Sequence, residues 1–258
     1  MLIDSHCHLN YAGVREDVPG VLARARAVGV GGFLGISTRV AEWETVIAQA
    51  NTEPDIWATV GVHPHEADHH PDTDTAMLVD AARHGRVIGI GETGLDYYYD
   101  KSDRGRQKAS FAAHITAARA TGLPIIVHTR DAEADTLALL AAPGEGALTG
   151  VIHCFTASQA FADAALALGF YISISGIVTF KNARDLQATA ATLPADRLLV
   201  ETDSPFLSPV PMRGRPCEPA FVVHTAAFLA GLRGDTPEDL AAKTTRNFFD
   251  LFTKARRP

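Results

Sequence analysis

The chain has 258 residues, and its 30 acidic and 23 basic side chains give a formal net charge of -7. Apolar residues make up 47% of the chain, which is enough for a buried core and excludes a wholly disordered protein. The acidic balance excludes a protein that coats nucleic acid with a broad basic face, because such binding depends on clustered Lys and Arg. It leaves open an enzyme that binds phosphates through metal ions.

No stretch approaches the ~20 uninterrupted apolar residues that a membrane span requires. The first ten residues, MLIDSHCHLN, are too polar for a signal peptide. Three scattered cysteines cannot form a disulfide framework; they are Cys7, Cys154 and Cys217. We therefore expect a cytoplasmic protein without a membrane segment.

Short runs rich in Val and Ile alternate along the chain with longer, Ala-rich stretches of helical composition. The expected strands, in chain order, are 2–4, 32–36, 56–62, 87–91, 125–128, 150–153, 170–175 and 198–201. The expected helices are 40–49, 74–84, 104–121, 132–141, 158–168, 183–193, 219–232 and 237–254. Eight strands that largely alternate with eight helices predict an α/β fold of the (β/α)8 barrel type, as a single domain over residues 1–258.

Two features separate this barrel from its rivals. The strands are continuously apolar rather than alternating, which is typical of parallel strands covered on both faces. A doubly wound open sheet normally has fewer strands at this length. The sequence GIGETG at 89–94 does not match the spacing of the dinucleotide-binding loop G-x-G-x-x-G.

Metal-capable side chains stand at six of the expected strand ends. Strand by strand they are His6 and His8 (first), His63 and His65 (third), Glu92 (fourth), His128 (fifth), His153 (sixth) and Asp203 (eighth). In a (β/α)8 barrel the C-terminal ends of all strands open on the same face, so these residues should converge. Such a series is hard to obtain by chance.

Two of these positions are informative by themselves. His6 and His8 form an H-x-H pattern on an extended segment, so both imidazoles point to one side and Cys7 points to the other, against the barrel wall. Glu92 lies in an apolar run between glycines, where a buried, unpaired carboxylate would be strongly unfavourable. A metal ion or an arginine is needed to compensate the charge of this carboxylate. The more specific hypothesis is a carboxylate that bridges metal ions.

The other polar residues admit more than one interpretation. His128 and His153 each close an apolar strand, where a hydrogen-bonded core histidine is the alternative to a ligand. Glu201 either shares the face of Asp203 or anchors the strand end. The remaining histidines are expected to be solvated; they are His69, His70, His84, His114 and His224.

Imidazole and carboxylate without thiolate suit a catalytic site for Zn, Mn, Mg or a similar divalent ion. Two ions that share one carboxylate, ~3.5–4 Å apart, can hold the attacking and leaving oxygens of a hydrolytic displacement. A serine triad is disfavoured, because Ser204 lacks a G-x-S-x-G turn and Ser175 has no evident base. Cys154 would face away from the adjacent His153, so a thiol nucleophile is also disfavoured.

Seven motifs cover essentially the whole chain: IDSHCHLN, GVHPHEA, GETGLDYYYD, PIIVHTRDA, VIHCFTAS, ETDSPFLSPVPMRGRPCEP and TTRNFFDLF. In this order they resemble the TatD-like metal-dependent hydrolases, often called TatD-type deoxyribonucleases. That family is similar to the wider amidohydrolase barrels, but a glutamate takes the bridging place that a carboxylated lysine fills elsewhere. In this chain the glutamate is Glu92.

The resemblance implies two divalent metal ions and a set of site residues. One ion would be bound by His6, His8, Glu92 and Asp203, and the second by Glu92, His128 and His153. Glu92 and Asp203 would be the catalytic carboxylates, with Asp203 handling the proton of the attacking water. His63 and His65 would contact phosphate or substrate; Arg213 and Arg215 would meet further phosphates or lie in a solvated loop.

The chain departs from the family pattern at three places. Ala157 stands where HCF-[ST]-G has its glycine, and Met212 and Cys217 replace a His and an Asn. None of these is a proposed ligand, so the departures concern substrate preference rather than metal binding.

The leading functional hypothesis is a divalent-metal phosphodiesterase, a deoxyribonuclease of the 3'-5' exonuclease type, acting on DNA as a monomer. A second hypothesis keeps the barrel and the metals but changes the bond to an ester or amide, as in an aminoacyl-tRNA deacylase. A third is a non-catalytic metal-binding or scaffold protein. Turnover of single-stranded oligonucleotides, charged tRNA and simple esters would discriminate among them.

Overall fold

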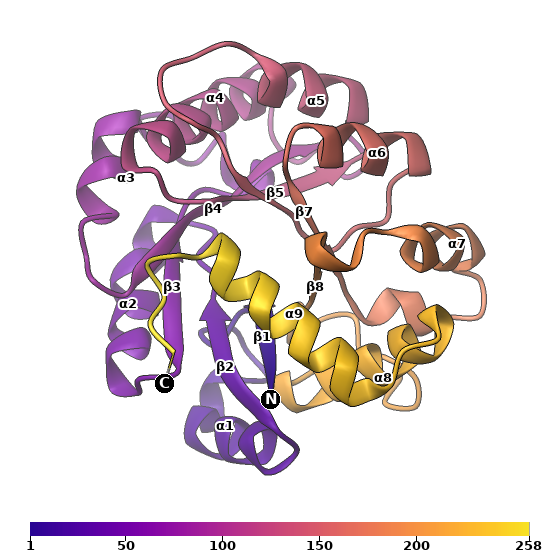
Figure 1. Ribbon diagram of the computed structural model, residues 1–258. Helices are drawn as coiled ribbons and strands as arrows, with labels where there is room; N and C mark the ends of the chain where they lie inside the picture. The colour runs from indigo at the N-terminus through magenta and orange to yellow at the C-terminus, as the bar shows by residue number, and fades with distance from the viewer. Residues whose placement is uncertain (258) are drawn as a thin grey trace.

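The computed structural model describes residues 1–257, which form a ring of eight parallel strands surrounded by helices (Figure 1). The strands follow one another around the ring in chain order, β1 to β8. The predicted (β/α)8 barrel is thus confirmed. The strands are β1 (Leu2–Cys7), β2 (Val30–Gly35), β3 (Ile56–Val60), β4 (Val87–Asp96), β5 (Ile125–Arg130), β6 (Gly150–Ile152), β7 (Tyr171–Ile174) and β8 (Leu198–Val200).

Nine α-helices lie among the described residues, one more than the sequence predicted. The additional helix is α1, and its start has ordinary signals: the Asp17 side chain accepts a hydrogen bond from Gly20 N at 3.1 Å, and a proline lies in the first turn. Within residues 1–257 no helix combines the length and apolarity needed to cross a bilayer. The helices are α1 (Val18–Ala27), α2 (Trp43–Thr52), α3 (Thr75–Ala81), α4 (Arg104–Thr121), α5 (Glu133–Ala141), α6 (Gln159–Ala167), α7 (Arg184–Thr192), α8 (Val222–Arg233) and α9 (Pro237–Leu251).

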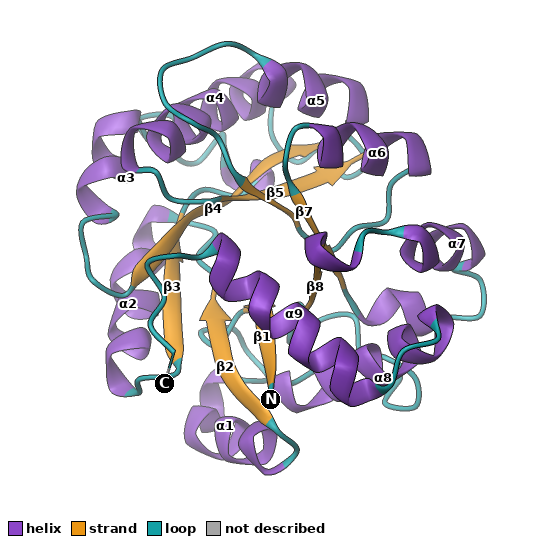
Figure 2. Cartoon of the chain, in the orientation of Figure 1, coloured by secondary structure: helices purple, strands orange, loops and turns teal. Residues whose placement is uncertain are grey.

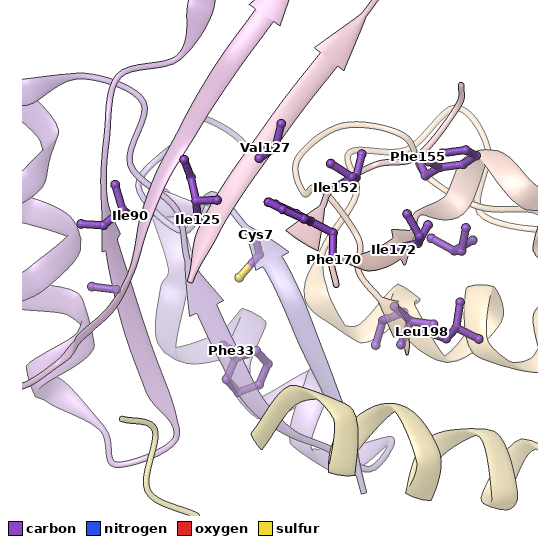
Figure 3. Packing of buried hydrophobic residues seen from close by; sticks show 14 of the residues in the cluster. Cys7, Phe33, Ile90, Ile125, Val127, Ile152, Phe155, Phe170, Ile172 and Leu198 are labelled. Carbon is purple, nitrogen blue, oxygen red and sulfur yellow. The ribbon is translucent and has the colours of Figure 1, made fainter. Parts of the chain in front are cut away.

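The apolar residues form two cores, one on each side of the strands. Because side chains alternate along a strand, Ile125 joins the outer core under the helices (Figure 3). Its neighbour Ile126 joins the core inside the ring. Cys7 belongs to the outer core, on the side that the H-x-H pattern predicts. Phe248 of α9 and Phe252, the residue directly after it, belong to the inner core, so this helix, which crosses the ring in Figure 2, seals one end of the barrel.

Strand β4 is longer than predicted, and this changes the position of Glu92. The expected strand ended at residue 91, but β4 continues to Asp96 and all ten residues are buried, so Glu92 lies within the strand. Gly91 and Gly94 have φ of +138° and +140°, and a Cβ at either position would collide with the backbone of β5. The glycines therefore allow β4 and β5 to approach closely beside Glu92.

The ring closes between β1 and the segment that follows β8. Asp203 N donates to His6 O at 2.9 Å, and His8 N donates to Ser204 O at 2.8 Å. Cys7 and Ser204 form an isolated parallel bridge. We call these contacts the closing seam. It runs through three of the predicted metal ligands.

Candidate metal centre

The six predicted metal ligands come together at the C-terminal ends of the strands. Five of them line a cavity of about 440 Å³: His8, Glu92, His128, His153 and Asp203. Metal-capable atoms of the described residues fall into three groups, and within each group all atoms lie within 4.8 Å of one another, a spacing that a metal ion can span. These groups are His6, His8 and Asp203; His6, His153 and Glu201; and His63, Glu92 and His128.

The Glu92 carboxylate lies at the centre of the cluster, and its two oxygens face different histidines. Oε1 is 2.8 Å from His153 Nε2 and 3.2 Å from His128 Nδ1. Oε2 is 3.2 Å from His6 Nε2 and 4.0 Å from His8 Nε2. Each oxygen is therefore directed at one of the two ligand groups that the family resemblance implies. This is the placement expected of a bridging carboxylate.

Asp203 approaches the cluster from the closing seam. Its Oδ1 is 3.3 Å from His8 Nε2 and 3.6 Å from His6 Nε2. Its carboxylate thus belongs to the His6–His8 group.

Hydrogen bonds on the outer side of two rings fix which nitrogen faces Glu92. His128 Nε2 donates to Asp96 Oδ2 at 3.0 Å, and His153 Nδ1 donates to Glu201 Oε1 at 3.2 Å. The proton of each neutral ring then sits on the outer nitrogen, and the inner nitrogen presents a lone pair. Metal-ligating histidines are commonly oriented by such carboxylates. Glu201 also accepts from Cys154 N at 2.8 Å, so it serves as the strand-end anchor that the sequence allowed.

His63 differs from the other histidines around Glu92. Its Nε2 is 3.3 Å from Glu92 Oε1, close enough for a ligand. Its Nδ1, however, accepts a hydrogen bond from His65 N at 3.1 Å, which leaves the ring proton on Nε2. A protonated Nε2 donates hydrogen bonds and does not ligate a metal. The geometry thus supports a donor role for His63, as predicted, rather than membership of the ligand set.

Several buried nitrogens in the cluster make no hydrogen bond with any residue in 1–257. They are Nδ1 and Nε2 of His6, Nδ1 of His8 and Nε2 of His153. Unpartnered buried polar atoms are unfavourable, and a divalent cation between the rings and carboxylates would satisfy those that point inward. The donor set of imidazoles and carboxylates also matches the preferences of catalytic divalent ions. The residues present therefore fit the metal centre that the family implies.

The electrostatics of the cluster keep its carboxylates ionised. Burial by itself would raise the pKa of Glu92, but the surrounding histidines, His153 foremost, hold that pKa well below its ordinary value. Burial would likewise raise the pKa of Asp203, and the hydrogen bond from His8 outweighs it. Burial and the neighbouring His153 lower the pKa of His6. Burial by itself would lower the pKa values of His8, His128 and His153, but the carboxylates that face these rings raise them. Imidazole binds metal in its neutral form, so metal binding at these rings would release protons.

Asp96 is a site residue that the sequence prediction missed. Its buried carboxylate accepts hydrogen bonds from His128 Nε2 at 3.0 Å and from His65 Nε2 at 2.9 Å. Asp96 lies four residues after Glu92 on β4, so both side chains point to the same face. The four-residue spacing between the two carboxylates can be read from GETGLD, but the predicted strand ended at residue 91 and left Asp96 outside it.

Asp4, on the first strand, is also buried and was not singled out. Its carboxylate accepts from Thr202 N at 2.9 Å and lies 2.6 Å from Thr202 Oγ1. Burial raises the pKa of Asp4 to about 8. The contact holds β1 against the segment after β8, next to the closing seam.

The prediction for His114 is wrong. This residue was expected to be solvated, but it is fully buried on α4. Its Nδ1 donates to Ser110 O at 2.7 Å and its Nε2 accepts from Val62 N at 3.0 Å, an arrangement that pattern alone does not reveal. His69 and His84 are exposed as expected, whereas His70 and His224 are half-buried.

The cations around the cavity are not the predicted ones. Arg213 and Arg215 are exposed and do not line the cavity, so a contact with substrate stays a prediction for them. The Arg213 guanidinium lies 3.9 Å from the centre of the Phe180 ring. The cationic side chains that line the cavity are Arg39, Lys101 and Arg130.

Comparisons with known proteins find relatives along almost the whole chain. A family model described as TatD related DNase matches residues 3–253. The uncharacterized metal-dependent hydrolase YcfH of Escherichia coli (strain K12) is 46% identical over 255 residues, which cover 97% of this chain and 95% of that protein. The 3'-5' ssDNA/RNA exonuclease TatD of Edwardsiella piscicida is 36% identical over 261 residues, covering 98% of this chain and 100% of that protein.

Among solved structures, the fold is similar to that of YJJV, a TatD homolog from Escherichia coli K12. The TM-score is 0.92 with 28% sequence identity, and the match covers 98% of both chains. A TatD family protein from Entamoeba histolytica has a similar fold, with a TM-score of 0.87 and 21% identity. Together with the family model and the YcfH relative, these matches show that the chain belongs to the TatD related DNase family.

Proposed function

We propose that this protein is a divalent-metal-dependent hydrolase that cleaves phosphodiester bonds of nucleic acid, as a deoxyribonuclease of the 3'-5' exonuclease type. The observation that carries the proposal is the placement of Glu92, whose two oxygens face separate groups of histidines in an open cavity. The name of the Edwardsiella piscicida relative supports nucleic acid as the substrate.

The ligand residues would hold two ions, with Glu92 shared between them. His6, His8 and Asp203 would complete one site, and His128 and His153 the other. When bound, the ions would polarise the phosphate and acidify the attacking water. Two divalent ions add four positive charges to the formal net charge of -7, which gives -3 and places the added charge at the cavity.

Three side chains would act on the substrate directly. Asp203 would accept the proton of the attacking water on its carboxylate. His63 would donate its Nε2 proton to a phosphate oxygen, since its other nitrogen is occupied by His65 N. Asp96 accepts a hydrogen bond from His65 Nε2 and holds this ring at the cavity wall, where the ring would pack against the substrate.

The first test is the variant Glu92→Ala. Because Glu92 faces both ligand groups, the variant should lose bound metal and activity together, as measured by elemental analysis and by degradation of a single-stranded oligonucleotide. Glu44→Ala changes an exposed glutamate on α2 and should retain both. Full activity in metal-free Glu92→Ala protein would refute the metal-dependent mechanism.

The choice of substrate is tested on the wild-type protein loaded with Mg, Mn, Co or Zn. Oligonucleotides labelled at the 5' or at the 3' end report the direction of degradation. Faster turnover of charged tRNA or simple esters than of DNA would favour the ester hydrolase instead. Metal binding without hydrolysis of any of these substrates would favour a non-catalytic protein.

A further inference from the structure

Part of the cavity wall carries aromatic and cationic side chains that the metal centre does not use. Tyr99, Lys101 and Arg130 line the cavity, and they come from the loop between β4 and α4 and from the end of β5. Neither Lys101 nor Arg130 forms an ion pair with any acidic residue in the part of the chain that the structure describes. Two free cations in an acidic protein are thus directed at the cavity.

The aromatic rings and Arg130 are packed together. The Arg130 guanidinium lies 4.2 Å from the centre of the Tyr98 ring and 5.1 Å from that of Tyr99. The two tyrosine rings are 4.9 Å apart and nearly perpendicular. A guanidinium stacked on a ring keeps its in-plane N–H groups available to a phosphate. We call Tyr98, Tyr99 and Arg130 the tyrosine–arginine wall.

The wall is held in place by the residues that orient the metal centre. Asp96 accepts hydrogen bonds from Tyr98 N at 3.1 Å and Tyr99 N at 2.8 Å, while its other oxygen accepts from His128. Arg130 lies two residues after His128 on β5, so both side chains leave the strand on the same side. The wall therefore stands beside the metal centre at a fixed position.

Both tyrosine rings are open to solvent. Tyr98 is 57% exposed and Tyr99 is 52% exposed, although each is a large aromatic side chain beside a cavity. Exposed aromatic rings that alternate with cations are the usual means by which proteins bind single-stranded nucleic acid, because bases stack on the rings and phosphates meet the cations. The composition of the wall matches this pattern.

We propose that the tyrosine–arginine wall binds the unpaired nucleotide next to the scissile phosphate, with the base stacked on Tyr99 and a phosphate bound by Arg130. The proposal rests on the nuclease function proposed above and adds the residues that select the substrate. A base inside a duplex is already stacked and paired, so the wall favours single-stranded ends.

The test compares Tyr99→Leu, which removes the aromatic face, with Tyr99→Phe, which keeps it. Two oligonucleotides are used: one with normal bases and one that is abasic at the degraded end. Tyr99→Leu should lower kcat/KM about tenfold on the normal substrate, the loss expected for one base–aromatic stack, and leave the abasic substrate unaffected. Tyr99→Phe should behave like wild type on both.

Arg130→Gln tests the phosphate contact separately. It should lower kcat/KM on both substrates and should flatten the dependence of log kcat/KM on log salt by about 0.7, the value for one phosphate of a single strand. Arg83→Gln, an exposed arginine after α3, should change neither. For the tyrosine, the matched control is Tyr171→Leu, because Tyr171 begins β7 at the opposite end of the barrel and also lies beside an arginine, Arg197.

The outcomes separate the two proposals. If wild type degrades DNA but Tyr99→Leu loses activity equally on normal and abasic substrates, or loses none, the wall proposal is wrong and the nuclease function stands. If wild type degrades no nucleic acid, the nuclease function itself is wrong. Metal content and melting temperature should match wild type in Tyr99→Leu and Arg130→Gln, because both side chains are exposed.

Discussion

Asp96 connects the metal centre with the surface that we propose for substrate. One oxygen accepts from the rings of His65 and His128, and the other accepts from Tyr98 N and Tyr99 N. All four partners are donors, and together they hold the pKa of this buried carboxyl well below its ordinary value, against the opposing effect of burial. A neutral side chain of the same shape cannot accept on both sides.

We therefore expect Asp96→Asn to weaken metal binding at the His128 site. The amide NH2 would face one pair of donors, so the affinity should fall by about 10- to 100-fold, as for other carboxylates that orient ligating histidines. Titration of the metal-free protein by calorimetry measures this change. The control Asp72→Asn alters an exposed aspartate and should bind as wild type does. Equal affinities in all three proteins would show that Asp96 does not orient His128.

Among the elements, β4 shows how much of the fold could be predicted from the sequence. The apolar pattern identified its first residues and placed Glu92 beside them, but the strand was expected to stop at a glycine-rich stretch. It continues because Gly91 and Gly94 adopt positive φ and let β5 approach, a tertiary contact that no local pattern encodes. The same error hid Asp96. Helix α1 was missed although its capping aspartate and proline are ordinary start signals.

The convergence of the candidate ligands was predictable because it depends on topology: residues at the ends of parallel strands meet on one face. The residues around the ligands were not predictable in this way. Arg130 and Tyr99 are unremarkable in the sequence, and only the fold places them on one cavity wall. Likewise, His114 resembles any helical histidine until the loop after β3 is packed against α4.

The burial of His114 predicts a pH dependence of stability. Burial lowers its pKa from 6.5 to about 4, so between these values the unfolded chain binds a proton that the native chain does not. The contribution of this group to the free energy of unfolding should therefore be greatest above pH 6.5. It should decrease by roughly 3 kcal/mol as the pH falls towards 4. Urea denaturation in the presence of EDTA measures it.

The comparison variant is His114→Gln, whose amide can replace both hydrogen bonds without titrating. Its unfolding free energy should depend less on pH than that of wild type between pH 6.5 and 4. His84→Gln, an exposed histidine, should retain the wild-type dependence. Parallel curves for His114→Gln and wild type would contradict the predicted role of this residue.

At the scale of the whole molecule, one end of the barrel carries the candidate metal centre and the other end is closed by apolar packing. The metal-capable residues occupy the C-terminal ends of the strands, whereas the rings of Phe248 on α9 and of Phe252 directly after it fill the barrel interior. In this architecture the active site typically lies at one end of the barrel, and the residues that mainly stabilise the fold lie at the other. Changes in α9 should therefore affect folding and not chemistry.

Phe248→Ala should lower the free energy of unfolding by about 3–5 kcal/mol, because it removes a fully buried ring from the inner core. The kcat of the protein that remains folded should be unchanged. Guanidinium denaturation and initial rates below the melting temperature measure the two quantities. Phe228→Ala, on the exposed side of α8, should have a much smaller effect on stability. A large loss of kcat with little loss of stability would show that α9 influences the site directly.

The closing seam has a consequence for how the protein is made. His6 and His8 leave the ribosome among the first residues, but Asp203 and Ser204, which close the ring against them, follow almost two hundred residues later. Until then the growing chain has an open edge at β1 and lacks one of the carboxylates of the metal centre. A nascent chain therefore carries an incomplete candidate metal centre, and synthesis of the segment after β8 completes the ring and the centre in one step.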